Sequence, residues 1–128
     1  MLPGHLGIRI VSVSDGLVEA TLQVRPIHLA PNGFLHGAAV VALADTATGY
    51  GCGRSLPPGA SGFTTAELKA NFLGTATSGA LQCIASLLHG GRTTQVWDAQ
   101  VTSEASGKTV ALFRCTQLIL WPRKGQVT

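Results

Sequence analysis

A single carboxylate interrupts an otherwise apolar segment in the first half of the chain. Residues 37–53 are rich in alanine, and Asp45 is the one charged residue among them. An aspartate is rarely buried without a partner, because removing a carboxylate from water is costly. A carboxylate held in a cleft can acquire a pKa suited to activating water or attacking carbon. We therefore interpret Asp45 as a catalytic group; the alternative is a thin solvent-facing stripe shared with Thr46 and Thr48.

The start of the same segment is the second feature, because glycines precede it in the stretch Asn32-Gly-Phe-Leu-His36-Gly37. Amide N–H groups in the first turn of a helix lack partners within the helix and lie at the positive end of its dipole. Such a terminus can hold an anion or a developing oxyanion. Equally open is the interpretation that Gly33 and Gly37 only permit tight packing and that His36 caps the first turn.

The spacing of these two features predicts a homo-oligomer. Asp45 follows Gly37 by eight residues, which corresponds to about 12 Å along a helix at ~1.5 Å per residue. A nucleophile or base and an oxyanion donor must both come within about 3 Å of one carbonyl group. One chain cannot supply both groups to one substrate, whereas two antiparallel copies can. A two-fold axis would then create two identical sites.

The elements that must position these residues follow from hydrophobic patterning and turn residues. Apolar residues at helical spacing and terminal glycines predict a helix over residues 37–53. Alternating residues around Ser14-Asp15-Gly16 predict a hairpin of residues 8–13 and 17–24. Four further strands are expected at residues 63–72, 80–89, 93–102 and 109–120. The class is α+β, and a helix with almost no polar face requires a curved antiparallel sheet wrapped around it.

The strand at 63–72 alternates regularly, and each of its faces has a predicted role. Ala66, Leu68, Ala70 and Phe72 form the face expected to meet the helix, and Thr65, Glu67, Lys69 and Asn71 form the other. On a later strand, Trp97 is expected to pack at an interface. Asp98 and Glu67 are the other candidates for a catalytic carboxylate, but a position on a solvated strand face is sufficient to explain the presence of both.

Length and composition limit the remaining possibilities. The 128 residues suit one domain, with a frayed tail at about 122–128. The charged fraction of 12% is about half the usual ~25%, which favours an oligomer that covers much of its surface. The net charge of +3 is scattered, so nucleic acid is not expected as a partner. No apolar run approaches the ~20 residues that span a bilayer, and no secretory signal is visible. Three distant cysteines predict neither disulfides nor a zinc site, and favour a reducing cytoplasm.

The chain resembles the hotdog-fold thioesterases, specifically the phenylacetate-pathway (PaaI-like) and 4-hydroxybenzoyl-CoA thioesterase branch. The segments that carry the resemblance are 33–37 (GFLHG), 43–46 (LADT), 64–72 (TTAELKANF) and 89–93 (HGGRT). The similarity extends from about residue 5 to 120. It implies a hotdog fold, in which a curved antiparallel sheet wraps one long central helix.

The resemblance also implies roles for particular residues. Asp45 matches the family's catalytic carboxylate, and the N–H of Gly37 matches the donor that polarises the thioester carbonyl from the opposite subunit. His36 matches a residue that shapes the pocket. The candidates for substrate contacts are Thr65 and, less securely, Thr64, together with Thr46, Asn32, Gly91, Arg92 and Thr93. Arg92 would meet a phosphate of coenzyme A. Many relatives carry Asn or Gln where this chain has Ala30, so a neighbour takes that role or the Gly37 donor acts alone.

These parts predict an acyl-CoA thioesterase acting on a small, aromatic acyl group of the hydroxybenzoyl or phenylacetyl type. Thioester hydrolysis requires no metal or redox cofactor, and none is expected. Asp45 would act as nucleophile, through a mixed anhydride, or as general base. A dimer of dimers in the cytoplasm is the expected assembly. The alternatives are a hotdog hydratase or dehydratase and a non-catalytic acyl-CoA-binding module.

Overall fold

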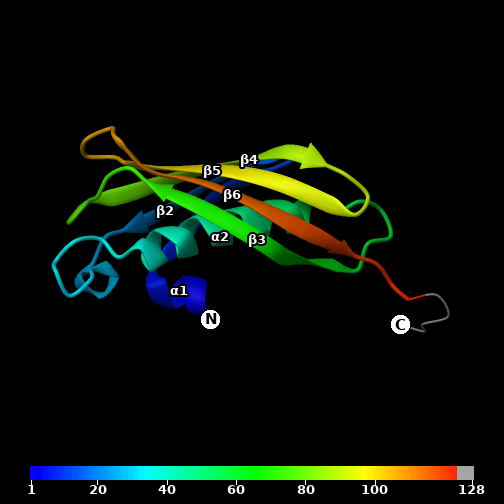
Figure 1. The fold of residues 1–128 in the computed structure, drawn as a ribbon, viewed down its shortest axis with the longest axis horizontal. Coiled ribbons are helices and arrows are strands. Elements are labelled where there is room, and N and C mark those ends of the chain that lie inside the picture. Colours follow the sequence, from blue (N-terminus) through cyan, green and yellow to red (C-terminus); the bar gives the residue numbers. More distant parts are fainter. Residues whose placement is uncertain (124–128) are drawn as a thin grey trace.

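The chain forms one antiparallel sheet of six strands around a long helix, in a computed structural model that describes residues 1–123 (Figure 1). The helices are α1 (Leu2–Leu6) and α2 (Gly37–Arg54), with a short 3-10 turn at Pro26–His28. The strands are β1 (Ile8–Ser14), β2 (Leu17–Gln23), β3 (Gly62–Phe72), β4 (Ala80–Gly90), β5 (Thr94–Ser103) and β6 (Thr109–Leu120). Their order across the sheet is β1-β2-β4-β5-β6-β3. The predicted class, helix and strands are confirmed. The tail expected from residue 122 lies mostly outside the described residues.

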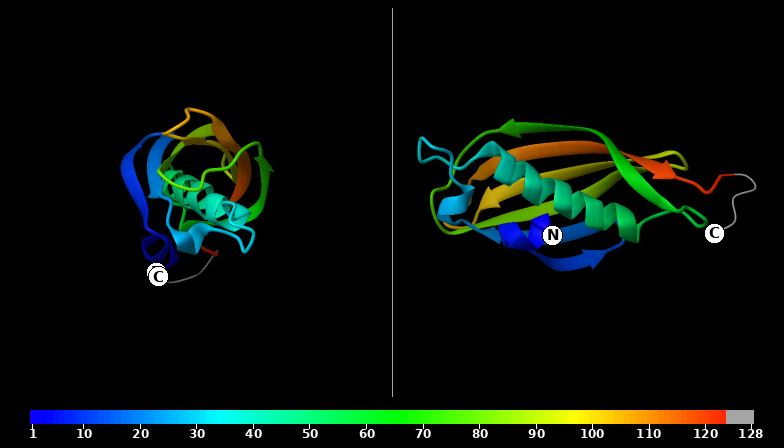
Figure 2. Two further views of the ribbon diagram at one scale, coloured as in Figure 1. Left: turned by 90° about the vertical axis from the view of Figure 1, so that its left-hand side faces the viewer. Right: turned by 90° about the horizontal axis from the view of Figure 1, so that it is seen from below.

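Helix α2 explains why the sheet is curved. Its buried residues are almost all small or aliphatic and recur in pairs every four residues, and most of the residues between these pairs are also partly buried. A helix that is apolar nearly all round must be covered nearly all round. Seen along the molecule, the strands curl about α2 and leave one side of it uncovered (Figure 2). The two edges of the sheet are β1 and β3.

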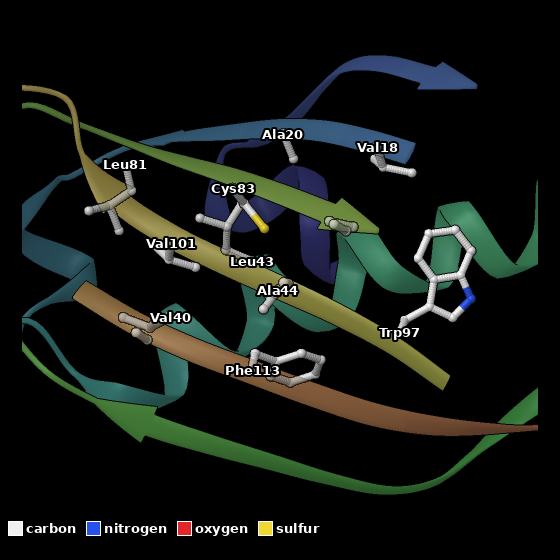
Figure 3. Close-up of a cluster of buried hydrophobic side chains, with 14 of the residues drawn as sticks. Val18, Ala20, Val40, Leu43, Ala44, Leu81, Cys83, Trp97, Val101 and Phe113 are labelled. Carbon is white, nitrogen blue, oxygen red and sulfur yellow. The ribbon is translucent and has the colours of Figure 1, made fainter. Parts of the chain in front are cut away.

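The core lies between α2 and the concave face of the sheet (Figure 3). Leu43, Ala44 and Ala47 of α2 are fully enclosed there, and so is Trp97 of β5. The expectation that Trp97 packs at an interface was therefore wrong, because its ring is buried within one chain. The ring lies directly against Gly51 of α2, where a Cβ atom would overlap it. Large and small residues thus interlock at this position.

The segment before α2 contains two short elements that the sequence patterns did not reveal. Helix α1 is attached to the 3-10 turn by His28, which is almost completely buried. His28 Nδ1 accepts a hydrogen bond from the Arg25 amide at 2.9 Å, and Nε2 donates to the Leu6 carbonyl at 2.7 Å. His28 is therefore a satisfied core histidine, as expected for an imidazole without metal-ligand spacing.

A β-bulge in β3 changes which side chains face the helix. Thr65 pairs with Gln117 of β6, but the next pair is Glu67 with Thr116, so Ala66 is an extra residue. A bulge shifts the alternation of faces by one residue. The sequence pattern correctly placed Leu68 and Phe72 toward the helix, but placed Thr65 on the wrong face. Thr65 faces inward, opposite the buried Gln117.

The contact between Gly51 and Trp97 leads to a stability prediction. In Gly51→Ala the new methyl group meets a buried ring that has no space to move into, so unfolding free energy should fall by about 1–3 kcal/mol. Gly53→Ala is the matched control, because its Cβ would lie 3.8 Å from Phe63 Cε1. Alanine is favoured over glycine in a helix by up to about 1 kcal/mol, so the control should be neutral or stabilising. Urea unfolding of both variants measures the difference, and equal effects would contradict it.

Candidate active site

Asp45 lies in the middle of α2, partly buried. Burial raises the pKa of its carboxyl above the ordinary value. Within residues 1–123, the carboxylate oxygens of Asp45 form no side-chain hydrogen bond and no ion pair. The alternative of a solvent-facing stripe does not fit, because Thr48 is wholly buried and its hydroxyl donates to the Asp45 carbonyl at 3.1 Å. The structure thus presents an uncompensated carboxylate that is partly withdrawn from water.

The start of α2 has features of both predicted roles, a capped and tightly packed helix end and a site with a free amide donor. His36 is the N-cap, and its Nδ1 accepts a hydrogen bond from the Ala38 amide at 3.0 Å. The Gly37 N–H, in contrast, has no hydrogen-bond partner among the described residues. The ring of Phe72 packs on Gly37, where a Cβ atom would lie 3.0 Å from Cζ. His36 therefore fixes the helix start, and the unpaired N–H of Gly37 remains available as a donor.

Strand β3 lies beside α2 and runs in the opposite direction. Phe72, at its end, packs on Gly37, and Phe63, at its start, reaches Gly49 and Gly53. Asp45 lies between these contacts, about 12 Å along α2 from Gly37, and this distance corresponds to about four residues of a strand. Leu68 lies four residues before Phe72 and pairs with Cys115 of β6. Asp45 is thus level with Leu68, and Gly37 is level with Phe72.

The two predicted threonines of β3 lie on opposite faces. Thr65 faces the helix and donates its hydroxyl hydrogen to Gln117 Oε1 at 2.7 Å. Thr64 pairs with Leu118, which is exposed on the outer face of the sheet. The inward position of Thr65 brings it toward the part of α2 that carries Asp45. Gln117 was missed by sequence reasoning, because nothing local distinguishes a glutamine that the sheet buries from one in solvent.

An apolar groove runs along the C-terminal half of α2, from Thr46, the residue after Asp45, to Arg54. Its volume is about 540 Å³. The residues that line it are Pro3, Thr46, Gly49, Tyr50, Gly53, Arg54 and Phe63. Of these, sequence reasoning had named Thr46; the available signal was the pair of glycines four residues apart, which leaves one stripe of the helix without side chains. The groove gives the site an apolar compartment on one side of the carboxylate.

The remaining predicted residues belong to two segments, the loop before α2 and the turn between β4 and β5, which lie at opposite ends of α2 (Figure 1). Asn32 precedes the helix, and its Oδ1 accepts from the Phe34 amide at 3.1 Å. Gly91, Arg92 and Thr93 form the turn between β4 and β5, at the opposite end. Arg92 stacks 4.3 Å from the centre of the Trp121 ring, whose Nε1 donates to the Arg92 carbonyl. Within one chain, therefore, Asn32 and the turn of residues 91–93 do not lie in the same site.

The two other candidate acids, Asp98 and Glu67, form hydrogen bonds with side chains away from Asp45. Asp98 accepts a bidentate hydrogen bond from Arg114 on the outer face, which lowers the pKa of the Asp98 carboxyl. Glu67 accepts a hydrogen bond from Thr116 at 2.9 Å. The cysteines are buried, and burial raises the pKa of the Cys83 thiol to about 12. No three His, Cys, Asp or Glu side chains in residues 1–123 are grouped closely enough to bind a metal ion. Neither helix of this part is long and apolar enough to cross a membrane.

Comparisons with known proteins agree with this geometry. Residues 32–110 match the family profile of the Thioesterase superfamily. The chain is 35% identical over 119 residues to a 1,4-dihydroxy-2-naphthoyl-CoA hydrolase of Listeria monocytogenes, covering 93% of this chain and 95% of the relative. It is 36% identical over 110 residues to the acyl-coenzyme A thioesterase PaaI of Escherichia coli, covering 85% and 75%.

Among solved structures, a thioesterase from Haemophilus influenzae is 30% identical and superposes with a TM-score of 0.85, over 93% of this chain and 82% of the other. The shared fold is the hotdog fold expected from the sequence. The matched region contains both Asp45 and Gly37. The chain belongs to the thioesterase superfamily.

Proposed function

We propose that this protein hydrolyses the thioester of a small acyl-CoA, with Asp45 as the reacting carboxylate. The observation that carries the proposal is the state of Asp45: it is partly buried, has no ion-pair partner among the described residues, and lies one helical turn before Gly49, which lines an apolar groove. Membership of the superfamily supports the reaction class. The names of the Listeria and Escherichia relatives support a coenzyme A thioester as substrate.

The chemistry requires a donor for the carbonyl oxygen and a nucleophile for the carbonyl carbon. The unpaired N–H of Gly37, at the positive end of the α2 dipole, is the proposed oxyanion donor. Asp45 either removes a proton from water or attacks the carbon itself. The tetrahedral intermediate then collapses, the C–S bond breaks, and the thiolate of coenzyme A takes up a proton, which comes from Asp45 on the general-base route and from water on the other. If Asp45 attacks directly, water must then hydrolyse the mixed anhydride to release the free acid and restore the carboxylate. Preorganised amide donors of this kind typically contribute about 3–4 kcal/mol to barrier lowering.

We propose that two copies share each site, because Gly37 and Asp45 of one chain are about 12 Å apart along α2. The edge strand β3 supports this, since most of its residues are exposed and its outer backbone groups face no neighbour within the described chain. An antiparallel β3–β3 pair centred on Ala70 would set Leu68 opposite Phe72 of the second copy. Asp45 would then be level with Gly37 of the second copy. Two such dimers would associate further into a dimer of dimers.

The groove supports an aromatic acyl group. It is wide enough for one or two fused rings, and Phe63 and Tyr50 provide aromatic walls. The acyl carbonyl would lie at Asp45 and the ring beside Gly49 and Gly53. The coenzyme A moiety would extend away from the groove, with Arg92 as the candidate for a phosphate. The buried, unpaired thiols are consistent with the proposed cytoplasmic location.

The role of Asp45 is tested by thiol release from a panel of benzoyl-, hydroxybenzoyl-, phenylacetyl- and aliphatic CoA esters. Asp45→Asn should lower kcat by about 10²–10⁴-fold, the usual contribution of a positioned base. Asp98→Asn is the matched control and should retain activity, because Asp98 is bound to Arg114 on the outer face. Binding of all esters without thiol release would favour a binding module, and hydration of enoyl-CoA would favour a hydratase.

Ionisation of Asp45 should lower the free energy of unfolding at neutral pH. Burial raises the pKa of this carboxyl in the folded chain, so the folded state binds the proton more tightly than the unfolded state. Wild type should therefore lose stability relative to Asp45→Asn as the pH rises from about 4, the ordinary aspartate value. The two proteins should be nearly equal below that pH. Urea unfolding at pH 3.5–8 measures the difference, and a constant difference across the range would contradict it.

The shared site predicts where two copies can be cross-linked. Single cysteines at Leu68, Lys69, Ala70 and Asn71 should form intermolecular disulfides on oxidation, most efficiently close to Ala70. Val11→Cys, exposed on the opposite edge strand β1, is the control. The native cysteines are buried and should not interfere. Dimers on a non-reducing gel measure the outcome; full activity of a species that sedimentation shows to be a lone chain would refute the shared site.

A further inference from the structure

Two buried glutamines interrupt the apolar concave face of the sheet close to the site. Gln95 of β5 and Gln117 of β6 pair with each other across the sheet, and each is at most 2% exposed. Gln95 is fully engaged: its Nε2 donates to the Ser55 carbonyl and its Oε1 accepts from Trp97. Gln117 Oε1 accepts from the Thr65 hydroxyl, whereas its buried Nε2 has no partner among the described residues.

An incompletely satisfied amide in this position is unfavourable for folding. The inward neighbours of Gln117 on β6 are Cys115 and Ile119, both buried and apolar. An apolar side chain at position 117 would therefore avoid burying an amide group that lacks a partner. A polar residue at such a position suggests a role other than stability. The contact that distinguishes Gln117 from Gln95 is the one with Thr65.

The hydrogen bond to Gln117 determines what the Thr65 hydroxyl can do. A hydroxyl has one hydrogen to donate and two lone pairs that accept. The hydrogen of Thr65 is committed to Gln117 Oε1, at 2.7 Å. The lone pairs remain, so Thr65 is held as an acceptor. Thr65 is itself exposed, so water can reach this acceptor in the single chain.

The position of Thr65 relates this acceptor to Asp45. Thr65 lies on the helix-facing side of β3 because Ala66 forms the bulge. It lies between Phe63, which is near Gly49, and Leu68, which the contacts of Phe72 with Gly37 and of Phe63 with Gly49 place level with Asp45. In this arrangement a water molecule that donates one hydrogen to Thr65 would direct the other toward the side of α2 that carries the Asp45 carboxylate. Its own lone pair is then directed away from both acceptors.

We propose that Gln117 is a positioning residue, which holds the Thr65 hydroxyl as an acceptor for the attacking water and thereby directs the reaction through Asp45 as general base. This inference rests on the proposed thioesterase function. In the step, Asp45 takes one proton from water while the water oxygen bonds to the thioester carbon. The C–S bond then breaks, and the proton on Asp45 passes to the departing thiolate. The products are the free acid and coenzyme A, with no further reactant.

A double-mutant cycle tests the link between the two residues. Gln117→Met and Thr65→Val should each lower kcat about tenfold, the equivalent of one hydrogen bond, with KM changed less than twofold. In the Thr65→Val background, Gln117→Met should have no further effect, because its target is already absent. The Tm of Gln117→Met should be unchanged or higher, since an unpaired buried amide is removed. Thr65→Ser should retain most of the activity.

Gln95→Met is the matched control. It removes a buried amide from the same layer of the core but has no contact with Thr65. It should lower Tm, and any effect on kcat should add to that of Thr65→Val. Additive effects for Gln117→Met and Thr65→Val, or unchanged kcat in Gln117→Met, would overturn the positioning role.

A single turnover in ¹⁸O-labelled water tests the route on the unaltered protein. The general-base route puts the label in the released acid and none in Asp45, whereas a mixed anhydride hydrolysed at its aspartyl carbon labels Asp45. Label in Asp45 would overturn the inference but leave the thioesterase function intact. If wild type releases no thiol from any ester, the proposed function fails first, and the inference falls with it.

Discussion

The rigidity of one helix is the constraint on which the site depends. An α-helix rises by about 1.5 Å per residue and does not bend to bring its own residues together. Gly37 and Asp45 are therefore held apart, and this separation is maintained by the sheet that encloses α2. A chain with both groups on one helix can combine them in one site through the symmetry of an assembly. The exposed edge strand β3 lies beside both groups and is the natural place for that symmetry axis.

The same helix links stability to chemistry. Packing of Trp97 on Gly51 fixes the C-terminal half of α2 against the sheet, and the His36 cap fixes its start. Between these points, glycines leave the groove open and Asp45 is held partly out of water. An alanine-rich helix can approach the sheet closely, which makes a narrow site with few charges. The same alanine-rich helix thus accounts for the low charge content of this region and for the absence of a charged partner beside Asp45.

Most of the fold could be predicted from the sequence, because it depends on repeating patterns. The turns at Ser14-Asp15-Gly16 and the alternating strands gave the hairpin and the sheet, and the helical spacing of residues 37–53 gave α2. Asp45 stood out because it contradicts its surroundings. Trp97 was misplaced, since a sequence does not show which large residue faces a glycine on a distant helix. Gln117 could not be found, because its burial depends on the position of β6 beside β3.

The bulge at Ala66 has a consequence for how such proteins diverge. The pairs Thr65–Gln117 and Glu67–Thr116 flank Ala66 and use adjacent residues of β6, so loss of Ala66 would leave a regular ladder in which Thr65 still faces inward. Regular pairing of the full sequence, in contrast, would shift the residues before Glu67 by one position and point the Thr65 hydroxyl away from the carboxylate. A one-codon deletion at Ala66 would therefore keep every other side chain of β3 on its present face. Relatives whose β3 strands differ by one residue can thus present the hydroxyl on the same face, and they should be compared by strand pairing rather than by residue count.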